Sequence, residues 1–216
     1  RHTRKKSRVI YNAIDENWFE EDNLTYGTGK ILYAGRMIEW KGIDVLLESL
    51  ALVTEKRSCL LMIAGPRSPE YEKTAEKLDI KENVRFVGSV GLDRMKELYQ
   101  QTDLVVMPSL VPESFGRSLA EGMALAKPVI GTNVGAVPEL IREGENGFLV
   151  PPGDPRSLAD RIFALLNDRE LQRKMGERGR GFIREHCLAG EVSGRYEKVY
   201  GSIINPGEQQ REFDQP

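Results

Sequence analysis

The chain has 216 residues, of which 40% are hydrophobic and 30% charged, and its formal net charge is -2 at pH 7. These values are typical of a globular protein, and they argue against nucleic acid as a partner, because proteins that bind it usually carry a basic excess on one face. Two cysteines, Cys59 and Cys187, are too few for a disulfide framework or a cysteine metal cluster, so we expect a cytoplasmic protein.

The chain begins with a basic segment, residues 1–8, followed by a short apolar strand at 9–12 and a polar connector at 16–29. We interpret the basic segment as a solvated lead-in. The alternative is electrostatic contact with an anionic membrane, which would place the protein peripherally at the inner membrane face. No apolar run approaches the roughly 18 residues that span a bilayer. Because the first residue is arginine and the first element begins abruptly, we expect a piece of a longer protein.

Short apolar strands alternate with helices along the rest of the chain. Six strands are predicted, at 30–34, 59–64, 84–87, 104–107, 128–131 and 147–150. Helical spacing predicts helices at 42–53, 69–78, 93–101 and 116–126, a helical turn at 137–141, helical segments from 158 to about 185, and a last helix at 191–204. Strands between helices indicate an α/β fold, a Rossmann-like, doubly wound parallel sheet of about six strands, and the absence of polar alternation indicates that both faces are covered.

This pattern predicts four parts. Residues 1–29 form the lead-in, short strand and connector, and residues 30–187 form the sheet domain. Residues 188–204 form a separate last helix, and residues 205–216 form a polar tail. Ligands of such sheets bind beyond the carboxyl ends of the strands, so the loops at that edge are the candidates for a site.

The first of these loops, residues 35–42 (GRMIEWKG), carries Arg36 and Lys41 between two glycines. Two cations at the carboxyl end of a strand can neutralise a diphosphate, arginine as a bidentate fork and lysine as a point charge. The alternative is that both are ordinary surface cations. Neither a GxGxxG nor a GxxxxGK[ST] phosphate-binding motif occurs in the chain.

The second loop lies in the segment 103–121 (DLVVMPSLVPESFGRSLAE), which reads as a buried strand, a loop and the start of a helix. Pro108 ends the strand because proline cannot donate to a ladder. Ser114 is expected to cap a helix that begins near Gly116. A helix start at the carboxyl edge of a sheet suits an anion, and Gly116 lets a ligand approach the backbone closely.

Two carboxylates, Glu113 and Glu121, bracket this helix start. A pair of glutamates can act as general acid and base, as in glycoside hydrolases, or can accept hydrogen bonds from sugar hydroxyls. The neighbouring phosphate-type site and the apolar surface of Phe115 favour sugar binding. The alternative is an acidic first turn that only stabilises the helix.

Other catalytic chemistry is not indicated. The two histidines lie in charged stretches, and neither a Ser–His–Asp pattern nor a cluster of metal ligands is present. Arg117 is expected to be a surface side chain. Three further acidic residues are expected to be caps and turn formers, namely Asp103, Glu139 and Asp154.

Taken together, these motifs resemble the donor-binding half of retaining glycosyltransferases of family 4, also called group 1, with the GT-B architecture. The resemblance covers about residues 9–185. Its segments are VIYNAID at 9–15, GRMIEWKG at 35–42, the E-x7-E pattern at 113–121, GTNVGAVPELI at 131–141 and GENGFLVPPGD at 144–154. One small departure is Gly-Ala at 135–136, where Gly-Gly is common in the family.

The resemblance implies a role for each matching residue. Arg36 and Lys41 would hold the donor diphosphate and stabilise its charge as it leaves, and with Glu113, which would bind hydroxyls of the transferred sugar, they form the implied catalytic set. The remaining implied donor-binding residues are Ser114, Phe115, Gly116, Leu119 and Glu121, of which Glu121 would bind the ribose and Leu119 would pack near the nucleoside. The loop 88–91 would lie at the base.

The same resemblance implies transfer of a hexose from a UDP or GDP sugar to a glycan or lipid-linked acceptor, with retention and without a metal or cofactor. The acceptor would bind to an N-terminal domain outside this chain, onto which the last helix would cross, so the isolated domain is expected to be inactive. Alternatives are a GT-B nucleotide-sugar epimerase and a non-catalytic nucleotide-sugar-binding module. A glycoside hydrolase is less favoured because it would leave the loop 35–42 unexplained.

Overall fold

The computed structural model describes residues 8–19 and 24–204, and its centre is one parallel sheet of six strands in the order β3-β2-β1-β4-β5-β6. The strands are β1 (Lys30–Ala34), β2 (Leu60–Ala64), β3 (Val84–Gly88), β4 (Leu104–Met107), β5 (Val129–Thr132) and β6 (Gly147–Val150). The predicted fold class and all six predicted sheet strands are therefore confirmed. The predicted polar tail lies outside the described residues, as does all of the basic segment except Arg8.

The order of the strands reverses between β1 and β4. Ile31 of β1 pairs with Leu61 on one side and with Leu104 on the other. The chain therefore builds β2 and β3 outward from one side of β1, and β4, β5 and β6 outward from the other. A reversal of this kind leaves a crevice beyond the carboxyl ends of the two central strands, where the loops after β1 and β4 meet.

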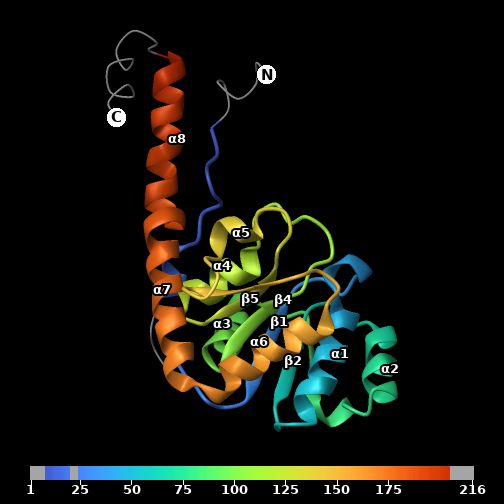
Figure 1. Ribbon diagram of the computed structural model, residues 1–216. Coiled ribbons are helices and arrows are strands. Elements are labelled where there is room, and N and C mark those ends of the chain that lie inside the picture. Colours follow the sequence, from blue (N-terminus) through green and yellow to red (C-terminus); the bar gives the residue numbers. More distant parts are fainter. Residues whose placement is uncertain (1–7, 20–23, 205–216) are drawn as a thin grey trace.

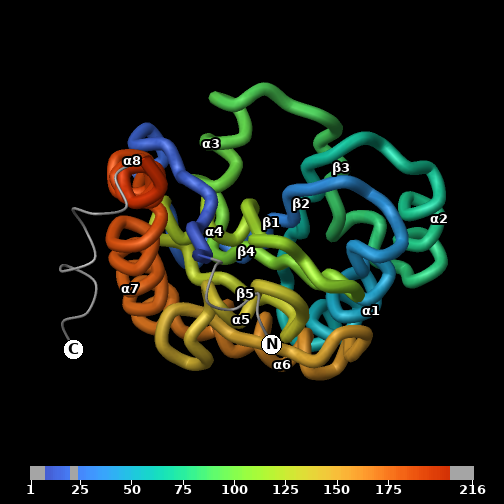
Figure 2. Tube along the Cα trace, turned by 90° about the horizontal axis from the view of Figure 1, so that it is seen from above, coloured from blue at the N-terminus to red at the C-terminus, as the bar shows by residue number. Residues whose placement is uncertain are grey.

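Helices cover both faces of the sheet (Figures 1 and 2). The apolar core on one face joins strand residues to α1 (Ile43–Thr54), α2 (Pro69–Lys77) and α6 (Pro155–Asn167). The core on the other face joins them to α3 (Leu92–Gln100), α4 (Arg117–Ala124), α5 (Val137–Leu140) and the end of α7 (Arg169–Cys187).

Neighbouring residues of one strand enter different cores. Ile31 and Tyr33 belong to the core with α1, whereas Leu32 belongs to the core with α4. Successive side chains of a strand point to opposite faces, so a strand buried on both faces must be apolar at every position. This is the physical reason why the strands lack polar alternation.

The segment before the sheet differs from the prediction. Residues 9–12 form no strand, and the nearest sheet-type contact is a single parallel bridge between Ile14 and Leu188. The amide of Ile14 donates to the carbonyl of Cys187 at 2.7 Å, which draws the segment to the junction of α7 with α8 (Ala189–Ile204) instead of to a sheet edge. The predicted strand at 9–12 was wrong: Val9 is 82% exposed, Val9 and Ile10 line a groove with residues of α8, and Tyr11 packs against the core with α4.

The start of the predicted connector, residues 16–19, is helical and packs on the sheet domain. It forms a short 3₁₀ helix, Glu16–Phe19, whose Trp18 is buried and meets Tyr99 edge-on at 5.4 Å between ring centroids. The predicted helical stretch that ends near residue 185 divides into two helices at Asp168, whose carboxylate accepts from the amide of Leu171 and so caps α7.

Helix α8 extends away from the sheet domain (Figure 1). Its last apolar residues are exposed, from 45% at Tyr196 to 75% at Ile204, whereas Val192 near its start is buried. Within residues 8–19 and 24–204, no helix combines the length and the apolar composition that crossing a bilayer requires.

Candidate functional site

The helix start after β4 is arranged differently from the prediction. Helix α4 begins at Arg117, and its N-cap is Gly116, a glycine in the left-handed region at φ 89° whose position carries no side-chain capping bond. Ser114 lies two residues before the N-cap, so its predicted capping role was wrong. The first amides of α4 receive no side-chain cap and are available to an anion.

The loops after β1 and β4 are bound to each other. The amide of Leu110 donates to the carbonyl of Trp40 at 2.8 Å. Gly42, at φ 69°, comes so close to Pro108 that an added Cβ would lie 2.0 Å from the carbonyl oxygen of Pro108. Only glycine fits a positive φ at such a close approach, so Gly42 permits the contact that places Lys41 opposite the second loop.

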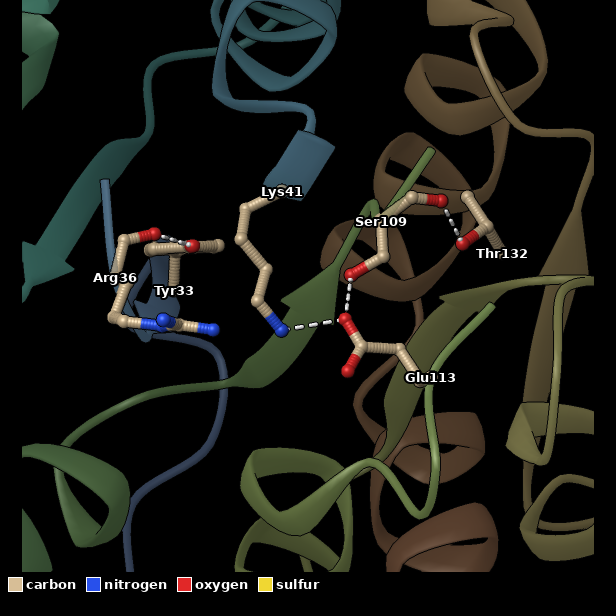
Figure 3. A network of polar contacts seen from close by, with 6 residues as sticks. All are labelled: Tyr33, Arg36, Lys41, Ser109, Glu113 and Thr132. Carbon is tan, nitrogen blue, oxygen red and sulfur yellow. Dashed lines mark hydrogen bonds and ion pairs between the residues drawn. The ribbon is translucent and has the colours of Figure 1, made fainter. Parts of the chain in front are cut away.

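Arg36 and Lys41 both face the crevice. The hydroxyl of Tyr33 donates to the carbonyl of Arg36 at 2.7 Å and thereby holds the first turn of the loop. Burial raises the pKa of Tyr33, and the charge of Glu113 raises it further, so this hydroxyl remains a donor at neutral pH. In Figure 3 the side chain of Lys41 lies between those of Arg36 and Glu113.

Glu113 is the centre of the polar contacts. Its Oε1 accepts from Lys41 Nζ at 2.5 Å and from Ser109 Oγ at 2.5 Å. Its backbone carbonyl accepts from the amide of Ala136 at 2.8 Å, which ties it to the loop after β5. Ser109 was not among the predicted site residues, because nothing local in the sequence distinguishes it from an ordinary loop serine.

Glu121 lies one turn into α4 and is held by two other donors. Arg117 Nε reaches its Oε1 at 2.8 Å, and the hydroxyl of the buried Tyr99 reaches its Oε2 at 3.2 Å. Burial and the neighbouring Glu121 carboxylate raise the pKa of Tyr99. Arg117 has an exposed side chain, as we expected, but it also lines the cavity and pairs with Glu121. Its spacing of four residues from Glu121 was the signal that could have indicated this pairing.

A cavity of about 410 Å³, within the range of ligand sites, lies between the loop after β1 and the start of α4. Seven of the eight predicted residues contribute to its wall, namely Arg36, Lys41, Glu113, Ser114, Phe115, Gly116 and Glu121. The eighth, Leu119, is fully buried in the core. Residues that the sequence did not indicate also line it, among them Asn12, Met95, Arg117 and Ser118. The structure thus brings seven of the eight predicted residues together, and the role of each residue remains a prediction.

Asp154 accepts from the amides of Arg156 and Ser157 and caps α6, as we expected. Asp103 does not cap its own segment. It accepts from the amides of Thr28 and Gly29, 75 and 74 positions away, and so holds the segment before β1 against the start of β4. Among the described residues, no cluster of three His, Cys, Asp or Glu side chains could hold a metal ion.

Comparison with known proteins gives a consistent result. The family described as glycosyl transferases group 1 matches residues 15–182. N-acetyl-alpha-D-glucosaminyl L-malate synthase from Bacillus anthracis is 32% identical over 211 residues, which are 93% of this chain and 55% of that protein. D-inositol 3-phosphate glycosyltransferase from Corynebacterium glutamicum is 31% identical over 159 residues, 69% of this chain and 38% of that protein.

The fold agrees with a solved structure as well. A glycosyltransferase from Rickettsia africae matches with a TM-score of 0.84 and 25% sequence identity, over 93% of this chain and 58% of that one. The chain spans about half the length of the first relatives that it matches, between 45% and 55% of each.

Proposed function

This chain belongs to the group 1 glycosyltransferases, and on that premise we propose that it is the donor-binding half of an enzyme that moves a hexose from a nucleoside-diphosphate sugar to a glycan or lipid-linked acceptor with retention. The acceptor would bind to a further domain, so this chain alone binds donor without transferring it. One observation carries the proposal: two cations, an uncapped helix start and two carboxylates line the same cavity, where the strand order reverses.

The cationic side of the cavity suits a leaving diphosphate. Arg36 and Lys41 supply two full positive charges, and the amino end of α4 adds partial positive charge from its free amides. Charge that builds up on the diphosphate as the bond to the sugar breaks is stabilised by groups already in place, which is the form of catalysis that costs the least reorganisation. This arrangement supplies the positive charge without a metal.

The acidic side suits hydroxyl groups. A carboxylate oxygen accepts hydrogen bonds, so Glu113 is assigned to hydroxyls of the sugar and Glu121, further along α4, to the ribose. The bond between the anomeric carbon and the diphosphate oxygen breaks, and a bond to the acceptor oxygen forms on the same face. The acceptor proton passes to the leaving diphosphate, so the scheme needs no protein nucleophile.

The test begins with binding. Isothermal titration of this chain with UDP, GDP and ADP should reveal millimolar or tighter binding of at least one, and a thermal-shift panel of the matching nucleotide sugars should then identify the sugar, because a ligand that binds the folded chain raises its melting temperature. If none of the three nucleotides binds at millimolar concentration, the assignment of the cavity fails.

The alternatives are separated by chemistry. A longer protein that contains this chain should transfer the sugar with retention, which NMR of the product's anomeric proton can establish. Conversion of the nucleotide sugar to an epimer would support an epimerase instead, and donor binding without transfer in that longer protein would support a non-catalytic module.

A further inference from the structure

The carboxylate of Glu113 is held at one oxygen by two donors of different kinds. Lys41 is a cation at the cavity wall, whereas Ser109 is a neutral hydroxyl donor whose residue is fully buried. Both reach Oε1 at 2.5 Å, and Figure 3 shows Oε2 directed away from both of them. Within the described part of the chain Oε2 receives no hydrogen bond, so it remains available to a ligand.

Ser109 itself is fixed by the sheet. It lies two residues beyond the end of β4, and its carbonyl accepts from Oγ1 of Thr132 at 2.6 Å. Thr132 is the last residue of β5, which pairs with β4, and both Ser109 and Thr132 are buried. Moving Ser109 would break a buried hydrogen bond, which costs more than the net worth of the bond because the partner is left unsatisfied.

The backbone of Glu113 is fixed separately. Ala136 donates to its carbonyl, and Gly135, at φ 56°, lies so close that an added Cβ would be 2.4 Å from that carbonyl oxygen and 2.5 Å from the amide nitrogen of Glu113. The loop after β5 therefore sets where Glu113 lies, and the donors on Oε1 set how its carboxylate is turned.

An arriving diphosphate changes only one of these donors. Lys41 lies where an anion would bind, and a diphosphate competes with the Glu113 carboxylate for its ammonium group. Ser109 is buried behind Glu113 and anchored to Thr132, so it cannot follow the ligand. We propose that Ser109, held by Thr132, is a positioning residue that keeps Glu113 oriented toward the sugar hydroxyls while Lys41 turns to the diphosphate, an inference that rests on the function proposed above.

The test compares two ligands on the same chain. Ser109→Ala should leave the affinity for the nucleoside diphosphate within about threefold of wild type, because Arg36, Lys41 and α4 are intact. It should lower the affinity for the corresponding nucleotide sugar by about tenfold, the usual cost of losing one hydrogen bond to a charged group. Calorimetry gives both affinities, and the quantity compared is the affinity for the nucleotide sugar divided by the affinity for the nucleoside diphosphate. A general loss of stability does not change this ratio.

Matched variants separate positioning from damage. Ser49→Ala removes another buried serine hydroxyl, which donates to Val45 in α1 away from the cavity, and should leave the ratio unchanged. Thr132→Val removes the hydroxyl that anchors Ser109, so it should lower the ratio as Ser109→Ala does. Thr132→Ser keeps a hydroxyl at this position, so its ratio should equal that of the wild type.

The outcomes are distinct from those of the proposed function. If the wild-type chain binds none of the nucleotides, the proposed function fails. If it binds them and Ser109→Ala and Thr132→Val both leave the ratio within twofold of wild type, or weaken the two ligands equally, the role of Ser109 is overturned.

Discussion

Two lysines lie at opposite ends of the parallel strands, Lys41 beyond the carboxyl end of β1 and Lys127 before the amino end of β5, and their surroundings differ. Lys127 is fully buried, and its Nζ donates to the backbone carbonyls of Thr25 at 2.8 Å and Gln100 at 2.9 Å. Lys41 is only partly buried, and its partner is a carboxylate in a ligand-sized cavity.

The difference separates a lysine with a structural role from one whose partner can be exchanged. Burial lowers the pKa of Lys127 to about 7, against the opposing pull of Asp103, and its ammonium also lies 4.5 Å from the ring centroid of Tyr26. Its partners are main-chain groups and an aromatic ring, so no ligand can replace them. Lys41, in contrast, can exchange the carboxylate of Glu113 for another anion, because both groups reach solvent.

The largest expected effect is on stability. Lys127→Ala removes the donor to the Thr25 carbonyl and one of the donors to the Gln100 carbonyl, and it opens a cavity at a fully buried position. It should therefore lower the free energy of unfolding by about 3 kcal/mol or more. Lys174→Ala, at an exposed position on α7, should change it by less than about 0.5 kcal/mol. Urea denaturation measures both, and a loss of less than about 1 kcal/mol of unfolding free energy in Lys127→Ala would contradict a structural role for Lys127.

The next effect is on binding. Lys41→Ala should weaken nucleoside-diphosphate binding by about tenfold or more, equivalent to about 1.4 kcal/mol, because a cation is lost and the Glu113 carboxylate then faces the ligand unpaired. Arg36→Ala should weaken binding in the same direction. In the wild type the affinity should fall as salt rises, since the contact is ionic. Calorimetry at two salt concentrations checks this. Unchanged affinities in both variants would show that the loop 35–42 does not bind the diphosphate.

The pH dependence of stability sharpens the contrast. With a pKa of about 7 in the folded chain and 10.5 as the ordinary value, Lys127 binds more protons when unfolded between these two values. Its contribution to the free energy of unfolding should therefore rise with pH across that window, by at most about 1.4 kcal/mol per pH unit.

The comparison uses Lys127→Met, which removes the titrating group. The difference in free energy of unfolding between wild type and Lys127→Met should increase from pH 7.5 to pH 9.5, and the thiols and tyrosines common to both proteins cancel. A difference that stays flat over those two pH units would show that Lys127 remains charged in the folded chain.

The smallest expected effect is an increase in affinity for the nucleoside diphosphate. Glu113→Gln removes the anion that competes for Lys41, so the affinity for the nucleoside diphosphate should rise by about twofold to fivefold, less than 1 kcal/mol. The preference for the nucleotide sugar over the diphosphate should fall, because the amide replaces an ionised acceptor. Weaker diphosphate binding in this variant would mean that Glu113 and Lys41 do not compete.

The sequence by itself determined the sheet and most of the cavity wall. Apolar runs and helical spacing are local properties, and they indicated six strands and the helices between them without reference to the fold. In a parallel sheet the carboxyl ends of all strands lie on one side, and every loop that follows a strand begins there. Arg36, Lys41, Glu113 and Glu121 could therefore be assigned to one site from their positions after β1 and β4.

Only the tertiary structure decided which polar groups hold that site. Ser109 acquires its role from Thr132, a residue 23 positions away in a neighbouring strand, and Lys127 acquires its role from Thr25, 102 positions away. Gly116 replaced Ser114 as the cap because the loop enters α4 in a left-handed turn. Such contacts form only where segments distant in the sequence meet. Where they meet is set by the packing of the two apolar cores, which no local pattern of residues encodes.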